Sequence, residues 1–114
     1  MIQFSIITVC LNAGQGLLDT VARTLSQTYE NFEIIVKDGG SEDGSLEKLP
    51  KDARIRVVTR QDTGIYDAMN QGIAEARGDY LIFMNCGDWF YSPDVLQSIA
   101  EGIGEQREPL YYGK

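Results

Sequence analysis

Asp88 is the residue of this 114-residue chain whose placement most clearly suggests chemistry. It follows the apolar run Tyr80–Met84 after a short polar turn that begins at Asn85. Ligands of open parallel α/β sheets bind outside the carboxyl ends of the strands, so an acid placed there is a candidate ligand or metal contact. Mg²⁺ prefers oxygen ligands and is commonly held by one or two carboxylates together with substrate phosphates, so a single acid can suffice. The alternative interpretation is that Asp88 only caps the following turn.

A second acid at a strand end is Asp38, which stands just beyond the apolar run Phe32–Val36 and opens a glycine-rich loop that continues to Ser45. Its carboxylate could accept hydrogen bonds from a ribose hydroxyl or a base N–H. Glycines such as Gly39 let a ligand approach the backbone closely. The alternative is a polar turn in which Asp38 or Ser45 caps a helix.

Asp67 and Asn70 form a third candidate group. They lie three residues apart in a segment with helical periodicity, and therefore on one helix face. The segment also carries a close-packing helix stripe of Ile65, Met69 and Ile73 with Ala68, Gly72 and Ala76. The face of Asp67 and Asn70 differs from the line of its large residues. The two polar side chains therefore point either into a cleft or into water.

Other polar and glycine-containing segments favour structural roles. Asp62 or Thr63, just before the helical segment, is typical of a helix N-cap. Gly14 and Gly16 begin a G-x-G-x-x-G pattern, but Asp19 occupies the third glycine position. A dinucleotide fingerprint is therefore excluded, and the sequence contains no P-loop motif.

Alternating strands and helices must position these candidates. Strands are indicated by nearly continuous apolar, β-branched runs, and helices by apolar residues at helical spacing. Ser92 and Pro93 are typical of an N-cap and a first helical position. The alternation favours a parallel sheet with right-handed crossovers. We predict strands over residues 4–11, 32–36, 55–59 and 80–84, helices over 16–27, 46–49, 65–76 and 93–103, and a last strand at 110–112.

Composition narrows the class of protein and its partners. With 17 acids, 10 bases and a net charge of -7, the chain lacks the basic surface that binds a nucleic-acid backbone, so we expect no nucleic acid as a partner. No apolar run approaches the ~20 residues of a transmembrane segment. The chain has no histidine, and Cys10 and Cys86 lack metal-ligand spacing, so both are expected to be reduced thiols. We expect a cytoplasmic protein, with a peripheral position at the inner face of the membrane as an option.

Four blocks of sequence, in order across nearly the whole chain, resemble family 2 glycosyltransferases of the GT-A fold. They are residues 5–12, 33–45, 64–74 and 78–88. The resemblance implies a Rossmann-like α/β fold, a three-layer αβα sandwich with a mostly parallel sheet. It also implies that residues 1–114 form the nucleotide-sugar-binding half of such a domain. The acceptor-binding half and the catalytic base would then lie beyond Lys114.

The same resemblance implies the ligands of the site. They are a UDP- or GDP-linked sugar donor, a saccharide or lipid-linked acceptor, and a divalent cation, Mn²⁺ or Mg²⁺. The end of the first strand and Asp38 would contact base and ribose, the block around Asp67 would line the donor site, and Asp88 would bind the cation with the diphosphate. The implied donor-site residues are Thr8, Cys10, Asn12, Asp38, Gly39, Asp67, Asn70, Asn85 and Asp88, with Asp88 as the metal ligand.

Two positions depart from the family pattern, and two other functions stay open. Residues 85–88 read Asn-Cys-Gly-Asp where many relatives have Asp-Ser-Asp-Asp, and Met69 stands where many have arginine. Both changes bear on phosphate affinity. The alternatives are a nucleotidyltransferase that forms a sugar nucleotide and a non-catalytic nucleotide-binding or regulatory module. A nucleotidyltransferase must hold a nucleoside triphosphate, and residues 12–16 contain no Lys or Arg to do so. An exposed sheet edge at 110–112 predicts a homo-oligomer.

Overall fold

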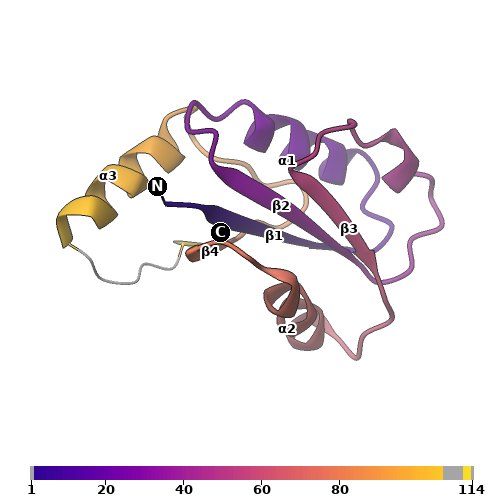
Figure 1. Cartoon of the computed structure of the whole chain (residues 1–114). Coiled ribbons are helices and arrows are strands. Elements are labelled where there is room, and N and C mark those ends of the chain that lie inside the picture. Colours follow the sequence, from indigo (N-terminus) through magenta and orange to yellow (C-terminus); the bar gives the residue numbers. More distant parts are fainter. Residues whose placement is uncertain (1, 107–111, 114) are drawn as a thin grey trace.

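A computed structural model shows an α/β fold and describes residues 2–106 and 112–113 (Figure 1). Strands and helices alternate along the chain, as the sequence pattern predicts. The predicted strand at 110–112 lies outside the described residues except for its last position. The strands are β1 (Phe4–Cys10), β2 (Phe32–Asp38), β3 (Ile55–Thr59), β4 (Tyr80–Phe83) and β5 (Tyr112–Gly113). The helices are α1 (Gln15–Leu25), the 3₁₀ helix η1 (Leu46–Lys48), α2 (Ile65–Glu75) and α3 (Val95–Gln106).

The sheet has the order β3-β2-β1-β4-β5, and each pair of neighbouring strands is parallel. The predicted parallel α/β fold is therefore confirmed. The chain first adds strands on one side of β1 and then returns to add β4 on its other side. This reversal makes β1 the centre of the sheet, and the carboxyl ends of β1, β2 and β4 point to one edge, where doubly wound folds bind ligands.

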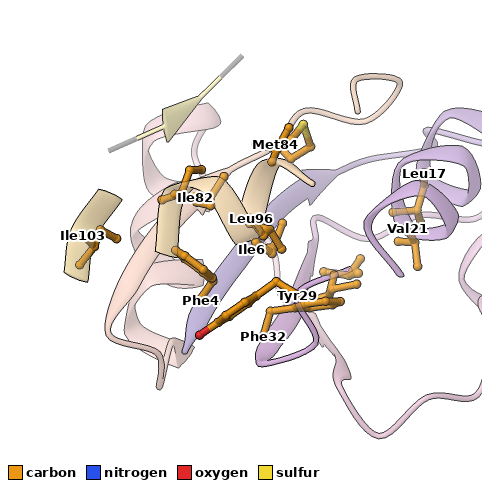
Figure 2. Close-up of a cluster of buried hydrophobic side chains, with 14 residues drawn as sticks. Phe4, Ile6, Leu17, Val21, Tyr29, Phe32, Ile82, Met84, Leu96 and Ile103 are labelled. Carbon is orange, nitrogen blue, oxygen red and sulfur yellow. The ribbon is translucent and has the colours of Figure 1, made fainter. Parts of the chain in front are cut away.

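Helices lie on both faces of the sheet, which gives three layers (Figure 1). The helix α2 packs on the face that carries Ile7, while α1 and α3 cover the opposite face and share its main apolar cluster. In that cluster the rings of Phe4 and Tyr29 meet edge to face, with centroids 5.5 Å apart (Figure 2). Within the described residues, no helix is both long and apolar enough to cross a membrane. The buried cluster consists of Phe4, Ile6, Leu17, Val21, Tyr29, Phe32, Ile34, Val36, Ile82, Met84, Val95, Leu96, Ile99 and Ile103.

Most predicted elements differ from the structure by one or two residues at an end, and two of these boundaries concern residues singled out in the sequence. Strand β2 continues to Asp38, so the loop acid is itself the last residue of the strand. Helix α3 begins at Val95 rather than at Pro93. The Ser92 hydroxyl accepts a hydrogen bond from the Asp94 N–H at 3.3 Å, which forms a turn before the helix instead of its N-cap.

The packing stripe predicted for α2 is confirmed at its small residues Ala68 and Gly72 but is wrong for Ile65 and Ile73. Ile65 is 52% exposed and Ile73 is 40% exposed, whereas the residues that α2 buries are Ala68 and Gly72. A Cβ built at Gly72 would lie 2.6 Å from Ile7 Cγ2, so this helix face nearly touches the strand. Small residues permit that short distance, and the isoleucines consequently turn away from the sheet.

We expect Gly72→Ala to destabilise the fold by about 1 to 3 kcal/mol, because the new methyl group overlaps a branched side chain in a central strand. The higher helix propensity of alanine offsets about 1 kcal/mol of this cost. Gly102→Ala is the matched control, since a Cβ at this glycine of α3 meets no atom within 4 Å. Chemical denaturation should show lower stability for Gly72→Ala and equal or higher stability for Gly102→Ala; equal stability of the two variants would contradict the packing described for α2.

A network around Glu33 fastens the end of α2 to the amino-terminal edge of the sheet. Glu33 accepts hydrogen bonds from the Ser5 hydroxyl at 2.6 Å, the Arg77 N–H at 2.6 Å and the Arg56 guanidinium at 3.1 Å. Arg56 also binds the backbone carbonyl of Glu75. Burial raises the pKa of the Glu33 carboxyl, but the hydrogen bonds outweigh burial and hold this pKa below its ordinary value.

The lowered pKa of Glu33 predicts a loss of stability in acid. A carboxyl whose pKa is lower in the folded than in the unfolded state stabilises the fold above the unfolded pKa, and this contribution disappears as the pH falls through the folded pKa. The free energy of unfolding should therefore decrease as the pH falls below the ordinary value of 4.5. Denaturation curves between pH 7 and pH 3 should show a shallower decrease for Glu33→Gln than for the unchanged chain; parallel pH profiles would contradict this role of Glu33.

Candidate functional site

A cavity of about 540 Å³ lies at the carboxyl edge of the sheet, between the ends of β1 and β2 and the start of α2. Its walls combine apolar side chains with the polar side chains of Gln61 and Asp62. Concave sites of this size and mixed character are typical of small-molecule binding. The lining residues are Val9, Cys10, Leu11, Gly39, Gln61, Asp62, Gly64, Ile65 and Ala68. We refer to this feature as the edge cavity.

Asp38 organises the loop beside the edge cavity. Its side chain is fully buried, and its carboxylate accepts hydrogen bonds from the backbone N–H groups of Gly40 and Ser41 at 3.2 and 3.0 Å, and from the Ser41 hydroxyl. The Thr59 hydroxyl and the Cys10 thiol also donate to it, at 3.3 and 3.6 Å. Burial raises the pKa of Asp38, but these donors, above all Ser41, hold it below its ordinary value. Asp38 is therefore an ionised loop anchor, and its contact with base or ribose stays a prediction.

The loops after β1 and β2 are joined to each other. The backbone N–H of Asn12 donates to the Ser41 hydroxyl, and the Asn12 side-chain oxygen accepts from the Glu42 N–H, both at 2.8 Å. Asn12 has a positive φ of 50°, a conformation that asparagine tolerates better than most residues. Asp43 adds a bond from the Gly14 N–H at 2.9 Å. These bonds fix the rim of the edge cavity on the side of β1.

Lys37 and Asp62 hold the opposite wall of the edge cavity. The Lys37 side chain is fully buried, and its Nζ lies 3.0 Å from Asp62 Oδ2. The other oxygen of Asp62 accepts a hydrogen bond from the Gly64 N–H at 3.2 Å, directly before α2. The bond from Lys37 holds the pKa of Asp62 below its ordinary value. The N-cap predicted at Asp62 or Thr63 is wrong, because Gly64 is the N-cap of α2 and no side chain caps it. Asp62 instead forms a turn before the helix and part of the cavity wall.

The two cysteines lie where β1 and the loop after β4 are neighbours. Both are free and half-buried, and the pKa of the Cys10 thiol is raised by its hydrogen bond with Cys86, by burial and by the charge of Asp38. The Cys86 thiol donates to the Val9 carbonyl at 3.4 Å. Deeper in β1, Thr8 is fully buried, and its hydroxyl has no hydrogen-bond partner among the described residues. Cys10 lines the edge cavity, whereas Thr8 is buried within β1 and does not line it.

The loop that carries Asp88 is fastened to α1 by Thr20. The Thr20 hydroxyl donates to the Asp88 carbonyl at 2.7 Å and accepts from the Gly87 N–H at 2.9 Å. The Gly87 N–H also lies 3.1 Å from the Gly16 carbonyl. These contacts bind the backbone of the loop and leave the Asp88 carboxylate without a hydrogen-bond donor among the described residues, in a half-buried position. The carboxylate is therefore available to a ligand.

We expect Thr20→Val to destabilise the chain by about 1 to 3 kcal/mol, because the Asp88 carbonyl loses its buried donor and the Gly87 N–H keeps only the Gly16 carbonyl as acceptor. Thr20→Ser keeps the hydroxyl and should recover most of the lost stability. Hydrogen exchange should be faster at the Gly87 amide in Thr20→Val than in Thr20→Ser. Equal exchange rates in both variants would show that the hydroxyl does not hold this loop.

Asp67 and Asn70 do not line the edge cavity. The Asp67 carboxylate accepts hydrogen bonds from the Thr63 N–H at 2.9 Å and from the Gln71 side chain at 3.2 Å, so it stabilises the first turn of α2. Asn70 is exposed on the same helix. The structure thus brings Cys10 and Gly39 to the cavity, with Asp38 beneath its rim, and places these two polar residues of α2 outside it.

The described residues contain no group of three or more His, Cys, Asp or Glu side chains that could hold a metal ion by themselves. A metal site in which the phosphates of a ligand supply further oxygens needs only one carboxylate, such as that of Asp88, from the protein. The half-buried Asp88 carboxylate, with no donor bound to it, fits a Mg²⁺ or Mn²⁺ ion that takes most of its oxygen ligands from substrate and water.

A second cavity, of about 420 Å³, lies on the outer side of α1 against the segment 89–93. There the Arg23 guanidinium stacks over the Trp89 ring, 4.2 Å from its centroid. Buried Gln27 binds the Ser92 carbonyl at 2.7 Å and so joins the segment to α1. We call this feature the α1 cavity; the residues predicted for the site do not line it.

Sequence reasoning overlooked Lys37 and Thr20. Lys37 belongs to a strand whose seven residues are all buried, and a lysine in such a strand must find polar partners, which is a signal that the sequence contains. Thr20 and Thr24 lie on the buried face of α1 among apolar residues, which also indicates hydroxyls with internal partners. Neither pattern identifies the partner. Thr20 binds residues 67 and 68 positions away, and Lys37 binds an irregular segment 23 and 25 positions away.

Comparisons with known proteins agree on one family. The model of the family described as Glycosyl transferase family 2 matches residues 5–113. A PGL/p-HBAD biosynthesis glycosyltransferase of Mycobacterium bovis is 40% identical, over 96% of this chain and 45% of its own length. The glycosyltransferase GlyG of Streptococcus pneumoniae is 30% identical, over 96% of this chain and 38% of its own. The chain thus spans less than half the length of these relatives.

Solved structures show the same fold. S. aureus TarS 1-349 in complex with UDP-GlcNAc superposes with a TM-score of 0.81 at 22% sequence identity, covering 92% of this chain and 32% of that one. The complex of TarS 1-349 with UDP superposes with a TM-score of 0.76. The GT-A fold expected from the sequence is therefore confirmed.

Proposed function

Because the chain belongs to glycosyl transferase family 2, we propose that it forms the nucleotide-sugar-binding part of a glycosyltransferase. The whole enzyme would transfer a sugar from a nucleoside diphosphate sugar, with UDP or GDP as the nucleotide, to a saccharide or lipid-linked acceptor. The observation that carries the proposal is the edge cavity, which lies at the carboxyl ends of β1 and β2. A neighbour of the same fold has been solved with UDP-GlcNAc, which supports a nucleotide sugar as the donor.

The proposal assigns base and ribose to the edge cavity. Cys10, Leu11 and Gly39 would form one side of this subsite, and Asp62 and Ile65 the other. Asp38 would act by holding the loop of Gly39 in place, because its carboxylate is already occupied by that loop. Leu11 and Ile65 are 62% and 52% exposed, so each has apolar surface that a bound base could cover.

The diphosphate would lie toward the loop of Asn85 and Asp88. The Asp88 carboxylate would hold a Mn²⁺ or Mg²⁺ ion together with the phosphates, and Asn85 could offer an oxygen from its side chain. Such an ion supplies Lewis-acid stabilisation of the departing diphosphate. Thr20 contributes by fixing the backbone on both sides of this position. Residues 1–114 contain no assigned catalytic base, and the proposal places that base in a longer form of the protein.

Isothermal titration calorimetry with UDP and with GDP, each with and without Mn²⁺, tests this function. The expected result is binding of one of the two nucleotides, strengthened by the cation. ATP is the control, since a regulatory module that binds nucleoside triphosphates would prefer it. If neither UDP nor GDP binds in the presence of Mn²⁺, the proposed donor site is wrong.

Three further parts of the proposal concern the whole protein. They are the acceptor class, a cytoplasmic location and association of two copies through the sheet edge at 110–112, most of which lies outside the described residues. Light scattering at high concentration addresses the last of these. A monomer at every concentration would remove the homo-oligomer from the proposal.

A further inference from the structure

Lys37 is the fully buried lysine on the α2 face of β2. Its Nζ donates hydrogen bonds to the Arg60 carbonyl at 2.6 Å, to Asp62 Oδ2 at 3.0 Å and to the Asp38 carbonyl at 3.2 Å. An ammonium group carries three donors, so these three acceptors satisfy it completely. A buried cation is tolerated when it is paired in this way, and its position is then fixed by its partners.

One partner of Lys37, Asp62, lines the edge cavity, and a second, Arg60, lies two residues before it in the same segment. Arg60 and Asp62 begin the segment that leads into α2, and this segment supplies Gln61, Asp62 and Gly64 to the cavity wall. The Arg60 N–H donates to the Asp38 carbonyl at 2.9 Å, which joins the segment to the end of β2 a second time. Lys37 therefore joins the buried strand β2 to the segment 60–64, which forms part of the cavity wall.

The opposite wall leaves little room for Asp62 to move. A Cβ built at Gly39 would lie 3.2 Å from Asp62 Oδ2, so the Asp62 carboxylate already lies close to the Gly39 backbone. The two sides of the cavity therefore meet at Gly39 and Asp62, and the position at which they meet depends on where Lys37 holds Asp62. Asp62 is 19% exposed, so it forms part of the surface that a ligand in the cavity would contact.

We propose that Lys37 is a positioning residue for nucleotide binding, which holds Asp62 and the segment 60–64 as the wall of the base and ribose subsite. The role rests on the proposed function, since it concerns the same cavity. Lys37 itself would not touch the ligand, because its side chain is fully buried and its donors are engaged. Its effect on the ligand would pass through Asp62 and through the backbone of the segment 60–64.

The experiment compares Lys37→Met, Lys37→Arg, Asp62→Asn and the double variant Lys37→Met/Asp62→Asn with the unchanged chain. The Kd for UDP or GDP, whichever the unchanged chain binds, is measured by calorimetry in the presence of Mn²⁺. Lys37→Met should raise Kd by about tenfold or more, because it removes the group that holds Asp62 in the wall and leaves a largely buried carboxylate without its cation. Lys37→Arg, which keeps a cation and several donors, should recover part of the affinity. Lys51→Met is the matched control, because this lysine is exposed in a loop and does not line the cavity.

A double-mutant cycle separates positioning from a general loss of stability. If Lys37 acts through Asp62, the two changes are coupled, and Kd of the double variant should be no higher than Kd of Lys37→Met. Hydrogen exchange at the Gly64 amide, measured without nucleotide, should become faster in Lys37→Met and in Asp62→Asn. Should Lys37→Met fail to fold, Asp62→Asn alone must raise Kd and accelerate this exchange.

The outcomes distinguish this role from the function on which it rests. If the unchanged chain binds UDP or GDP and both Lys37→Met and Asp62→Asn keep Kd within twofold, the nucleotide site stands and the positioning role is wrong. Fully additive effects of the two changes on Kd would also overturn action through Asp62. If the unchanged chain binds neither nucleotide, the proposed function and the role of Lys37 fail together.

Discussion

Replacing Asp88 by Asn is expected to remove most of the gain in nucleotide affinity that Mn²⁺ provides. Asp88 is the acid that residues 85–88 retain, and its half-buried carboxylate accepts no hydrogen bond from the described residues. An amide has no formal charge and only one oxygen, so it is a much weaker ligand for a hard cation. Even residues that merely orient a metal ligand account for about 10- to 100-fold in metal affinity, so loss of the ligand itself should cost at least as much.

The measurement is a calorimetric titration of UDP or GDP with and without Mn²⁺ for Asp88→Asn and for the unchanged chain. Affinity without the cation should be nearly equal in both, because Asp88 is assigned to the cation and not to the base. Asp94→Asn is the matched control, because Asp94 is exposed just before α3. Its carboxylate accepts a hydrogen bond from the Thr28 hydroxyl at 2.9 Å, and the side-chain oxygen of asparagine can accept the same bond. An unchanged gain from Mn²⁺ in Asp88→Asn would contradict the assignment of this acid to the metal.

Gly78→Ala is expected to cause the largest loss of stability among the substitutions considered. A Cβ at Gly78 would lie 2.6 Å from the Ser5 hydroxyl, 2.8 Å from the Gln3 carbonyl oxygen and 2.9 Å from the Phe4 carbonyl carbon. Two of these atoms belong to the backbone at the start of the central strand, so they cannot turn aside as a flexible side chain can. Overpacking of this kind costs about 1 to 3 kcal/mol and occasionally more.

The same substitution also disturbs a polar network. The Gly78 N–H donates to the Ser5 hydroxyl at 2.8 Å, and that hydroxyl donates to Glu33. Displacement of Ser5 would weaken two buried hydrogen bonds, which adds about 1 to 3 kcal/mol for each buried group left unsatisfied. Urea denaturation should place Gly78→Ala well below Gly72→Ala in stability, with Gly102→Ala as the control. If Gly78→Ala lost less stability than Gly72→Ala, β1 would shift easily and would not be a rigid centre of the sheet.

The sequence predicted the fold well where residues act locally. Nearly continuous β-branched runs identified β1 and β2, which are buried over most of their length, and β4, and a more exposed run identified β3. The packing stripe of α2 was predicted correctly at Ala68 and Gly72, but periodicity also placed the large apolar residues Ile65 and Ile73 in it, and these are exposed. The actual contact surface was chosen by how closely Gly72 lets the helix approach Ile7, and that distance depends on tertiary structure.

The candidate site was predictable only in part. The position of Asp38 and Asp88 at strand ends followed from the pattern of runs and turns, and both residues lie at that edge of the sheet. What the acids do there depends on their neighbours. Asp38 is surrounded by donors from its own loop, whereas Asp88 has its backbone fixed by Thr20 and its carboxylate unoccupied by the described residues. The donors of Asp38 belong to an irregular loop, and Thr20 is 68 residues from Asp88, so neither set of partners recurs at a spacing that the sequence pattern indicates.

The most direct test of the central claim is to locate the bound nucleotide on the chain. ¹⁵N NMR spectra recorded during titration with UDP, and separately with GDP, in the presence of Mg²⁺ report which amides change. The edge cavity predicts the largest shifts at Leu11, Gly39, Gln61 and Gly64. Shifts concentrated at Arg23 and in the segment 89–92 of the α1 cavity, or no shifts with either nucleotide, would contradict the account.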